Sequence, residues 1–277
     1  MAMNEQEIKK MMVDHGRKEA RQTVRLRLLT VATLILFLVV WQAVVDNGLV
    51  NSRTLPSPTT ILKAFMSKFS SKVPDGNTIL TNILASLQVS LFGFFAAVIL
   101  GVPLGLLMGW YKGMDRFCTV IFELVRPVPS IAWIPIVVMW MGIGLEAKVL
   151  IIFLSAFVPC VINSYTGVKL TNPVLVNVSK TLGAKNTEIF FRISIPSAVP
   201  MVMAGIRLAL GNSWSTLVAA EMLAASAGLG FMIQMGRQFS RADIVVMGML
   251  LIGILGACMS FLFTLIENHL LRWKVTR

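Results

Sequence analysis

Charged residues are scarce in this sequence of 277 residues. Asp, Glu, Lys and Arg together make up 14% of it, whereas soluble domains contain about 25%. Hydrophobic residues make up 56%, and the mean hydropathy is +0.77. This composition excludes an ordinary soluble domain and predicts an integral membrane protein.

Cysteine and histidine are also rare. The three cysteines, Cys118, Cys160 and Cys258, lie singly in or beside separate apolar stretches, so their spacing indicates neither a metal site nor a disulfide framework. The two histidines, His15 and His269, are isolated near the termini. We therefore expect no metal site and no histidine-dependent catalytic site.

Two motifs that are common in enzymes are missing as well. The sequence contains no G-x-x-x-x-G-K-[ST] run for nucleotide binding and no H-E-x-x-H run for a zinc hydrolase. These absences argue against an intramembrane hydrolase. They predict a chain with no catalytic residues and no cofactor of its own.

The formal net charge of +12 could suggest nucleic-acid binding, but its distribution argues against that partner. Seven cations precede Leu28, beside the first apolar run, where they would meet anionic membrane lipid. No basic groove or aromatic-interleaved motif accompanies them. We expect membrane lipid, and no nucleic acid, as the partner of this charge.

The apolar stretches predict an all-α integral membrane fold with six transmembrane helices, because each is near the roughly 20 residues that a spanning helix needs. Four stretches are free of charge: Leu28 to Val45, Ile83 to Trp110, Val149 to Val168 and Ile244 to Ile266. Two more carry charges: Phe117 to Met141 and Ile193 to Leu223.

The distribution of Lys and Arg predicts the orientation, because these residues accumulate on the cytoplasmic side of short loops. With an internal N-terminus, sixteen of the 25 lie inside, seven lie in outer loops and two lie within spans. Both termini are therefore expected in the cytoplasm. The expected organisation is a basic tail at 1–27, a first span with its extracytoplasmic connection at 28–82, a core at 83–266 and a tail at 267–277.

Two local patterns predict details of helices. Ser57 or Thr59 is expected to cap a short helix over 60–69. Gly101, Gly105 and Gly109 recur at steps of four and share one helix face. Small residues at this spacing allow a neighbouring helix backbone to approach closely, so we expect this face to pack against another span.

The run Arg126-Pro127-Val128-Pro129-Ser130 should break the third span. Non-helical backbone at membrane depth is tolerated only where protein or a water-filled cavity covers it, which favours a cavity edge here. Arg126 could pair with Glu123 or face the permeation route and attract anions. Trp133 could belong to the core or line the same route.

Small and polar residues form one stripe on the fifth span. Its members are Gly205, Ala209, Asn212, Ser213 and Thr216, and such a stripe should face protein or water. Arg207 and Glu221 lie about 21 Å apart along this helix, so each needs another partner. Alternatively, Glu221 marks the outer end of the helix in water.

The polar loop from Lys169 to Pro196 separates two long apolar segments. We expect two short helices broken at Gly183, because a glycine permits a turn that a β-carbon would obstruct. Such a loop can dock into a cleft of a soluble partner. Ile189, Phe190 and Ile193 are expected as apolar anchors for that partner, with Lys185, Glu188 and Arg192 as surrounding charges.

The same loop resembles the EAA loop of bacterial ABC importer permeases, whose pattern is E-A-A, three residues, G, nine residues, I-x-L-P. Gly183, Ile193 and Pro196 register with this pattern without gaps. The chain departs from it with Asn177, Val178 and Ser179 in place of Glu-Ala-Ala, and with Ile195 in place of Leu. Segments 126–135, 208–214 and 218–223 resemble the subgroup that serves nitrate, taurine and alkanesulfonates.

This resemblance implies a type I ABC importer permease fold with cytoplasmic coupling helices, and a permease core over 83–266. It also implies a second copy of the chain, two cytoplasmic ABC ATPase subunits that bind ATP and Mg, and an extracytoplasmic solute-binding protein. Residues expected at the ATPase contact are Thr181, Leu182, Gly183, Ala184, Lys185, Glu188, Ile189, Phe190, Arg192, Ile193 and Pro196. Residues expected along the translocation path are Arg126, Ser130, Trp133, Arg207, Asn212, Ser213, Thr216 and Glu221.

The expected cargo is a small anion such as a sulfonate, taurine or nitrate. A thiamine precursor or related heterocycle is the alternative cargo, since similar permeases also serve such solutes. A channel or ion-coupled transporter that acts without a motor is the alternative mechanism. Copurification of an ATPase distinguishes the two mechanisms.

Overall fold

The computed structural model describes residues 5–52 and 54–271, and these residues form helices without a β-strand among them. Residues 1–4 and 272–277 of the two predicted tails lie outside the described residues. The chain divides into two units, Met1–Lys63 and Ala64–Arg277. Each unit is described by itself.

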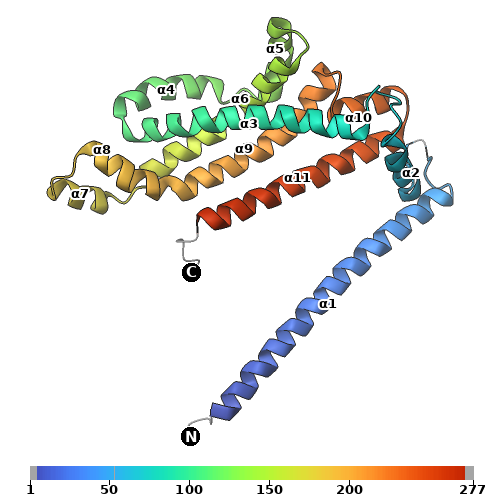
Figure 1. Cartoon of the computed structure of the whole chain (residues 1–277), viewed down its shortest axis with the longest axis horizontal. Coiled ribbons are helices and arrows are strands. Elements are labelled where there is room, and N and C mark those ends of the chain that lie inside the picture. Colours follow the sequence, from blue (N-terminus) through green and yellow to red (C-terminus); the bar gives the residue numbers. More distant parts are fainter. Residues whose placement is uncertain (1–4, 53, 272–277) are drawn as a thin grey trace. The chain divides into compact units, whose positions relative to one another are not determined.

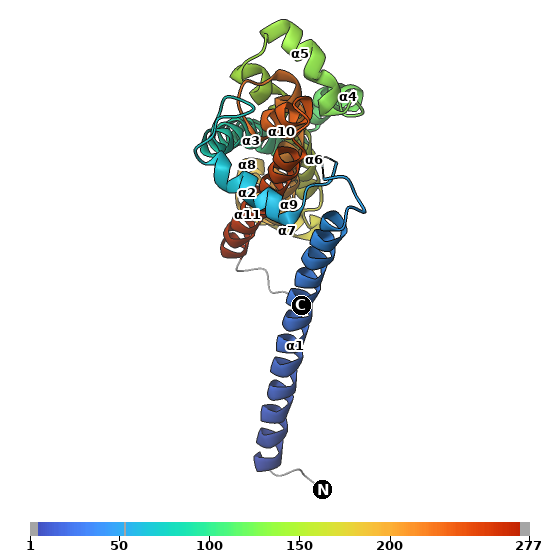
Figure 2. The same ribbon diagram turned by 90° about the vertical axis from the view of Figure 1, so that its right-hand side faces the viewer.

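The first unit contains one long helix, α1 (Glu5–Asp46), visible along its length in Figure 2. Its apolar part, Leu28–Asp46, is long enough to cross a membrane, as predicted. The following helix α2 (Pro58–Lys68) begins in this unit and is capped by Ser57, whose Oγ accepts a hydrogen bond from the backbone N–H of Thr60 at 3.3 Å. The predicted cap is therefore confirmed.

The second unit is a bundle of long helices with short helices at its ends (Figure 1). Its long helices are α3 (Ile79–Trp110), α4 (Lys112–Val125), α6 (Leu145–Lys169), α9 (Ile195–Ala224) and α11 (Ala242–Leu270). Its short elements are η1 (Ser130–Trp133), α5 (Ile134–Met141), α7 (Pro173–Thr181), α8 (Asn186–Ile189), η2 (Phe190–Ser194) and α10 (Leu229–Gln238).

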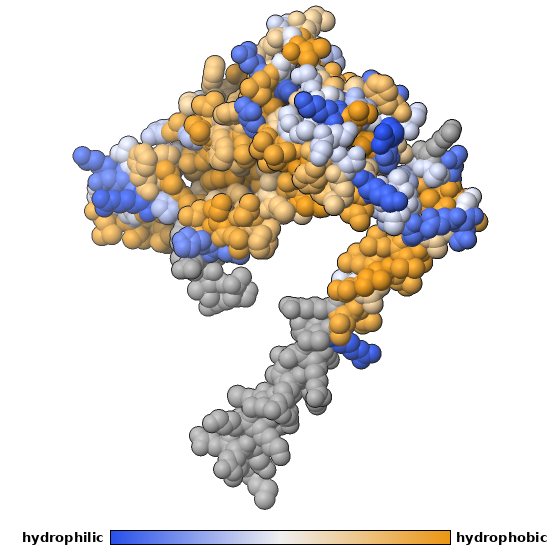
Figure 3. All heavy atoms as spheres, turned by 45° about the vertical axis from the view of Figure 1, so that its right-hand side comes forward, coloured by the Kyte–Doolittle hydropathy of each residue, from blue (hydrophilic) through white to orange (hydrophobic). Residues whose placement is uncertain are grey.

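The short helices mark two opposite ends of this bundle. The helices α7 and α8 lie at one end, and α10 lies with the first turn of α3 at the other. Figure 3 shows hydrophobic colours over the middle of the bundle and hydrophilic colours at the end that carries α7 and α8. This distribution is that of a protein whose middle faces lipid and whose ends face water.

Among the described residues, five helices are long and apolar enough to span a membrane, or up to six if one bent pair counts as a span. The bent pair is α4 with η1 and α5, which meet at 79°. Pro127 and Pro129 lie in the connection, where a proline cannot donate the backbone hydrogen bond that would continue the helix. The predicted break in the third span is therefore confirmed.

The centre of the bundle is α6, which packs against both α3 and α9. A β-carbon at Gly101 would lie 2.9 Å from Cβ of Cys160, and one at Gly109 would lie 2.7 Å from Cβ of Val168. A β-carbon at Gly105 would overlap the carbonyl group of Val161. The predicted glycine face is thus confirmed as the surface through which α3 approaches the α6 backbone.

Replacing Gly105 with alanine should therefore destabilise the bundle. The added methyl group must push α3 away from α6, and overpacking of this kind costs about 1–3 kcal/mol. The matched control is Gly113→Ala in α4, where a β-carbon would meet nothing within 4 Å. Denaturation of the purified protein in mixed micelles should show a lower midpoint for Gly105→Ala alone; equal midpoints would contradict the close packing.

Candidate functional site

The segment 169–196 folds into the two short helices that the sequence predicts. At the start of α7, Oδ1 of Asn172 accepts a hydrogen bond from the N–H of Val174 at 2.9 Å. Gly183 ends the turn after α7 with φ +84° and open space around it, so this position needs glycine for its backbone conformation. Glu188 then accepts a hydrogen bond from the N–H of Lys185 at 3.0 Å, which caps α8.

One prediction about this segment is wrong. Ile189 and Phe190 do not present outward anchors, because they are 1% and 4% exposed. The ring centroid of Phe190 lies 5.6 Å from that of Trp110 and 6.1 Å from that of Tyr111. Phe190 therefore attaches the segment to the end of α3, while Ile189 is buried and Ile193 is partly buried.

Other apolar side chains take the exposed positions. Leu182 is 82% exposed and stands beside Gly183 in the turn between α7 and α8. Other exposed apolar side chains of the same segment are Val174, Leu175, Val178 and Phe191. These four residues were not among those predicted at the contact, although Val174, Val178 and Leu182 recur at steps of four, the spacing of one helix face. Thr181, Lys185, Glu188, Arg192 and Pro196 are exposed as well, and Ala184 is half-buried.

The segment continues directly into a long membrane helix. Residues Phe190–Ser194 form a π-helical turn, and α9 begins at Ile195 with Pro196 in its first turn. Because Pro196 has no N–H, it cannot bond to the carbonyl four residues earlier, and the wider turn falls at that place. No flexible loop therefore separates α8 from α9.

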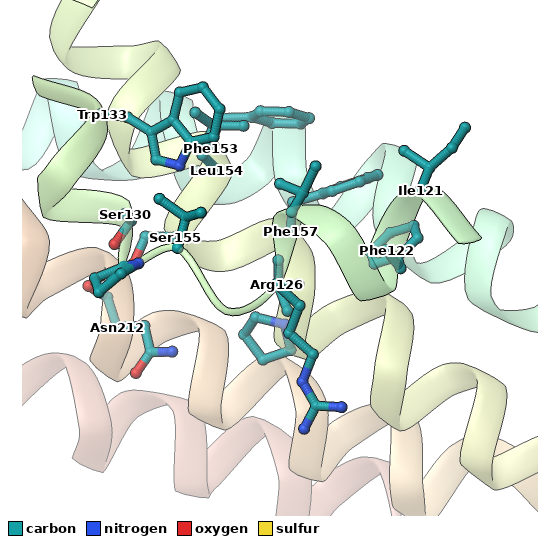
Figure 4. Close-up of a pocket in the computed structure, with 15 residues that line it drawn as sticks. Ile121, Phe122, Arg126, Ser130, Trp133, Phe153, Leu154, Ser155, Phe157 and Asn212 are labelled. Atoms are coloured by element: carbon teal, nitrogen blue, oxygen red, sulfur yellow. The ribbon is translucent and has the colours of Figure 1, made fainter. Parts of the chain in front are cut away.

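A cavity of about 320 Å³ opens at the break in the third span. Four predicted path residues line it: Arg126, Ser130, Trp133 and Asn212 (Figure 4). Arg126 is exposed, and its backbone N–H donates a hydrogen bond to the carbonyl of Phe122 at 2.8 Å. Within residues 5–52 and 54–271, its guanidinium forms no ion pair or hydrogen bond. Of the two predictions for Arg126, pairing with Glu123 is thus wrong, and its place on the permeation route stays a prediction.

Hydroxyl groups join the helices behind this cavity. Oγ1 of Thr216 lies 2.8 Å from Oγ of Ser155 and 3.3 Å from Oγ of Ser130. These contacts tie α9 to α6 and to η1. Ser213 is fully buried one residue after Asn212, so the predicted polar stripe faces protein at Ser213 and Thr216 and the cavity at Asn212.

The two charged residues of α9 lie away from the cavity. Arg207 forms an ion pair with Glu267 of α11 and donates a hydrogen bond to Oγ1 of Thr264 at 3.2 Å. Glu221 is fully buried, so the alternative that it ends in water is wrong. Arg207 and Glu221 thus have separate partners, as the distance between them along the helix requires.

Glu221 belongs to a buried polar network at the end that carries α10. Its carboxylate accepts hydrogen bonds from Oγ of Ser86 at 2.8 Å and from the N–H of Gly230 at 2.9 Å. Nearby, Asn82 accepts a hydrogen bond from the N–H of Gly228 at 3.0 Å and donates one to Asp75 at 2.6 Å. Asp75 is in turn ion-paired with Lys68.

This network fixes the turn between α9 and α10. Gly228 has φ +131°, and a β-carbon there would overlap the carboxylate of Glu221. The turn therefore packs directly onto Glu221. Among the described residues, no group of three His, Cys, Asp or Glu side chains is placed to hold a metal ion.

Long apolar helices, a polar two-helix segment at one end and a cavity at a broken span are features expected of a membrane transport subunit. The family model described as "Binding-protein-dependent transport system inner membrane component" matches residues 101–272. The chain belongs to this family, and it is a permease subunit of an ABC transporter.

Several relatives cover most of the chain. It is 34% identical to the taurine transport system permease protein TauC of Escherichia coli, over 88% of this chain and 89% of that one. It is 31% identical to a putative aliphatic sulfonates transport permease protein, SsuC of Bacillus subtilis, over 85% and 83%. It is 30% identical to the nitrate import permease protein NrtB of Synechocystis, over 85% and 86%.

A solved structure confirms the type I permease fold. An inward-facing structure of the MetNI methionine ABC transporter matches 72% of this chain and 96% of its own, with a TM-score of 0.58 and 20% identity.

Removal of the Glu221 carboxylate should loosen the turn at α10. Glu221→Ala leaves the Gly230 N–H and the Ser86 hydroxyl without their acceptor, and each unsatisfied buried group costs about 1–3 kcal/mol. Glu221→Gln keeps one acceptor oxygen and should lose less. Limited proteolysis should cut the alanine variant faster within 225–228; equal cleavage in all three proteins would contradict the network's role.

Proposed function

We propose that two copies of this chain form the membrane path of an importer for a small anion. ATP hydrolysed on two cytoplasmic ABC ATPase subunits would drive it, and an extracytoplasmic binding protein would deliver the solute. The family description and the relatives' names support this proposal. The names mention taurine, aliphatic sulfonates and nitrate, and each of these solutes carries an oxyanion group.

The structure of the segment 169–196 is the main support for the proposal that ATP hydrolysis by a partner drives transport. It offers the exposed Leu182 to a partner and holds buried Phe190 against Trp110 at the end of α3. It also runs without a loop into α9. A partner that grips α7 and α8 would therefore move α9 as a rigid body, which is a recognised way to switch between inward and outward openings.

A second connection lies at the start of the same segment. Nζ of Lys169, the last residue of α6, lies 3.0 Å from Oδ2 of Asp115 in the first turn of α4. The hydroxyl of Tyr165 donates a hydrogen bond to the same oxygen at 3.3 Å. Movement of the segment would thus also reach α4, which leads to Arg126 and the cavity.

The anion preference rests on Arg126. A positively charged guanidinium without a carboxylate partner favours an anionic solute. Ionisable groups inside a membrane mark substrate pathways. No Asp or Glu is among the residues that line the cavity. Arg207 is a weaker candidate for this role, since Glu267 already neutralises it.

The proposed orientation places the segment 169–196 in the cytoplasm, together with both termini. Single cysteines at Lys185 and at Lys72, both exposed, test it in a chain whose Cys118, Cys160 and Cys258 are replaced by alanine. A membrane-impermeant thiol reagent added outside intact cells should label the Lys72→Cys protein and spare the Lys185→Cys protein. The reverse pattern would contradict the whole proposal.

Gly183 should be required for coupling. A residue with a β-carbon pays about 1–2 kcal/mol in the left-handed conformation, which shifts the population of the native turn roughly five- to thirtyfold. Gly183→Val should therefore lower solute uptake per ATP hydrolysed, while the subunit still reaches the membrane. Gly183→Asn is the matched control, because asparagine tolerates this conformation; full coupling in the valine variant would refute the docking role.

A further inference from the structure

We propose that the cavity at the broken third span is a binding subsite for an organic anion with an apolar tail, such as an alkyl- or arylsulfonate, and that it selects against nitrate. This inference rests on the proposed function, because it names the class of anion that the path would favour. The subsite combines one cationic end with one aromatic wall.

The aromatic wall consists of stacked rings from two helices. The ring of Phe157 lies 5.8 Å from that of Phe122, with an angle of 28° between the planes. It also lies 4.9 Å from the ring of Phe153, at 27°. Trp133 adds a fourth aromatic side chain to the lining. Aromatic rings stack on one another and on apolar groups, so this wall suits a flat or aliphatic tail.

The polar groups of the lining lie apart from most of this wall. They are Arg126, Ser130, Ser155 and Asn212. Figure 4 shows Arg126 and Asn212 extending below the connection between α4 and η1, and Trp133 and Phe153 lying above it. An organic anion with its head group toward the polar residues of the lining would lay its tail along the rings. A guanidinium presents its donors in a planar fork that matches oxyanions such as sulfonate.

The size of the cavity points the same way. Its volume of about 320 Å³ is at the lower end of the range for pockets that enclose organic ligands. Nitrate has no apolar part and would gain only from the charge of Arg126. Each methylene group that the wall removes from water should improve affinity roughly fourfold. The apolar tail of an organic anion therefore accounts for the expected preference of the cavity over nitrate.

The test measures binding to the complete transporter, assembled with its ATPase subunits in lipid nanodiscs without the binding protein. Benzenesulfonate, ethanesulfonate and nitrate are titrated while tryptophan fluorescence is recorded. Benzenesulfonate should bind more tightly than ethanesulfonate, and nitrate should give no saturable change at the same concentrations. Trp133→Phe should abolish the signal, whereas Trp140→Phe, which alters an exposed tryptophan outside the cavity, should retain it.

Two variants separate the contributions of the wall and the charge. Phe157→Ala should weaken benzenesulfonate about tenfold, which corresponds to the loss of most of an aromatic contact, and should affect ethanesulfonate less. Arg126→Gln should weaken both sulfonates, and Arg126→Lys should restore part of the loss. Size-exclusion profiles and basal ATPase activity show whether each variant remains assembled.

Several results would overturn the subsite. They are equal affinity for nitrate and benzenesulfonate, unchanged affinity in Phe157→Ala or Arg126→Gln, and absence of any Trp133 signal, as expected if a second copy of the chain fills the cavity. ATP-driven anion uptake together with any of these results would remove the subsite and leave the proposed function standing. Saturable binding without ATP-driven uptake of any anion would support the subsite and contradict the proposed function.

Discussion

The close approach of α3 and α9 to α6 is the contact on which the other features depend. Helices in a membrane gain little from the hydrophobic effect between them and associate through tight packing of small residues. Here Gly105 brings α3 onto the carbonyl of Val161, and a β-carbon at Gly205 would meet Asn163 of α6 at 2.5 Å. Because α6 supplies Phe153, Ser155 and Phe157 to the cavity, this packing also positions the candidate path.

The segment 169–196 and the cavity are connected through the same helices. The segment begins where α6 ends and continues into α9, and α9 contributes Asn212 to the cavity lining. Thr216 then joins α9 to α6 through Ser155 at 2.8 Å. A force applied to α7 and α8 therefore has a continuous route of helix and hydrogen bond to the proline break. That route gives a physical basis for work done by a soluble partner to alter access to the cavity.

Patterns within short stretches of sequence were sufficient to predict much of this structure. The charge-free runs predicted the spans, Pro127 and Pro129 predicted the break, and Gly183 predicted the turn of the segment. Features that depend on distant residues could not be predicted in this way. Phe190 is buried because Trp110 lies beside it, and Glu221 is buried because Ser86 and Gly230 bond to it. The pairing of Arg207 with Glu267 likewise needs the packing of α9 on α11.

If a cytoplasmic ATPase subunit grips the turn at Leu182, it should shield that position from thiol reagents. The chain with Leu182→Cys and alanine at its three native cysteine positions is purified alone and in complex with its ATPase subunits. The complex should protect the new cysteine from a soluble maleimide, and a cysteine at Lys72 should react equally in both samples. Equal reactivity at position 182 in the presence and absence of the ATPase would show that the ATPase does not contact this turn.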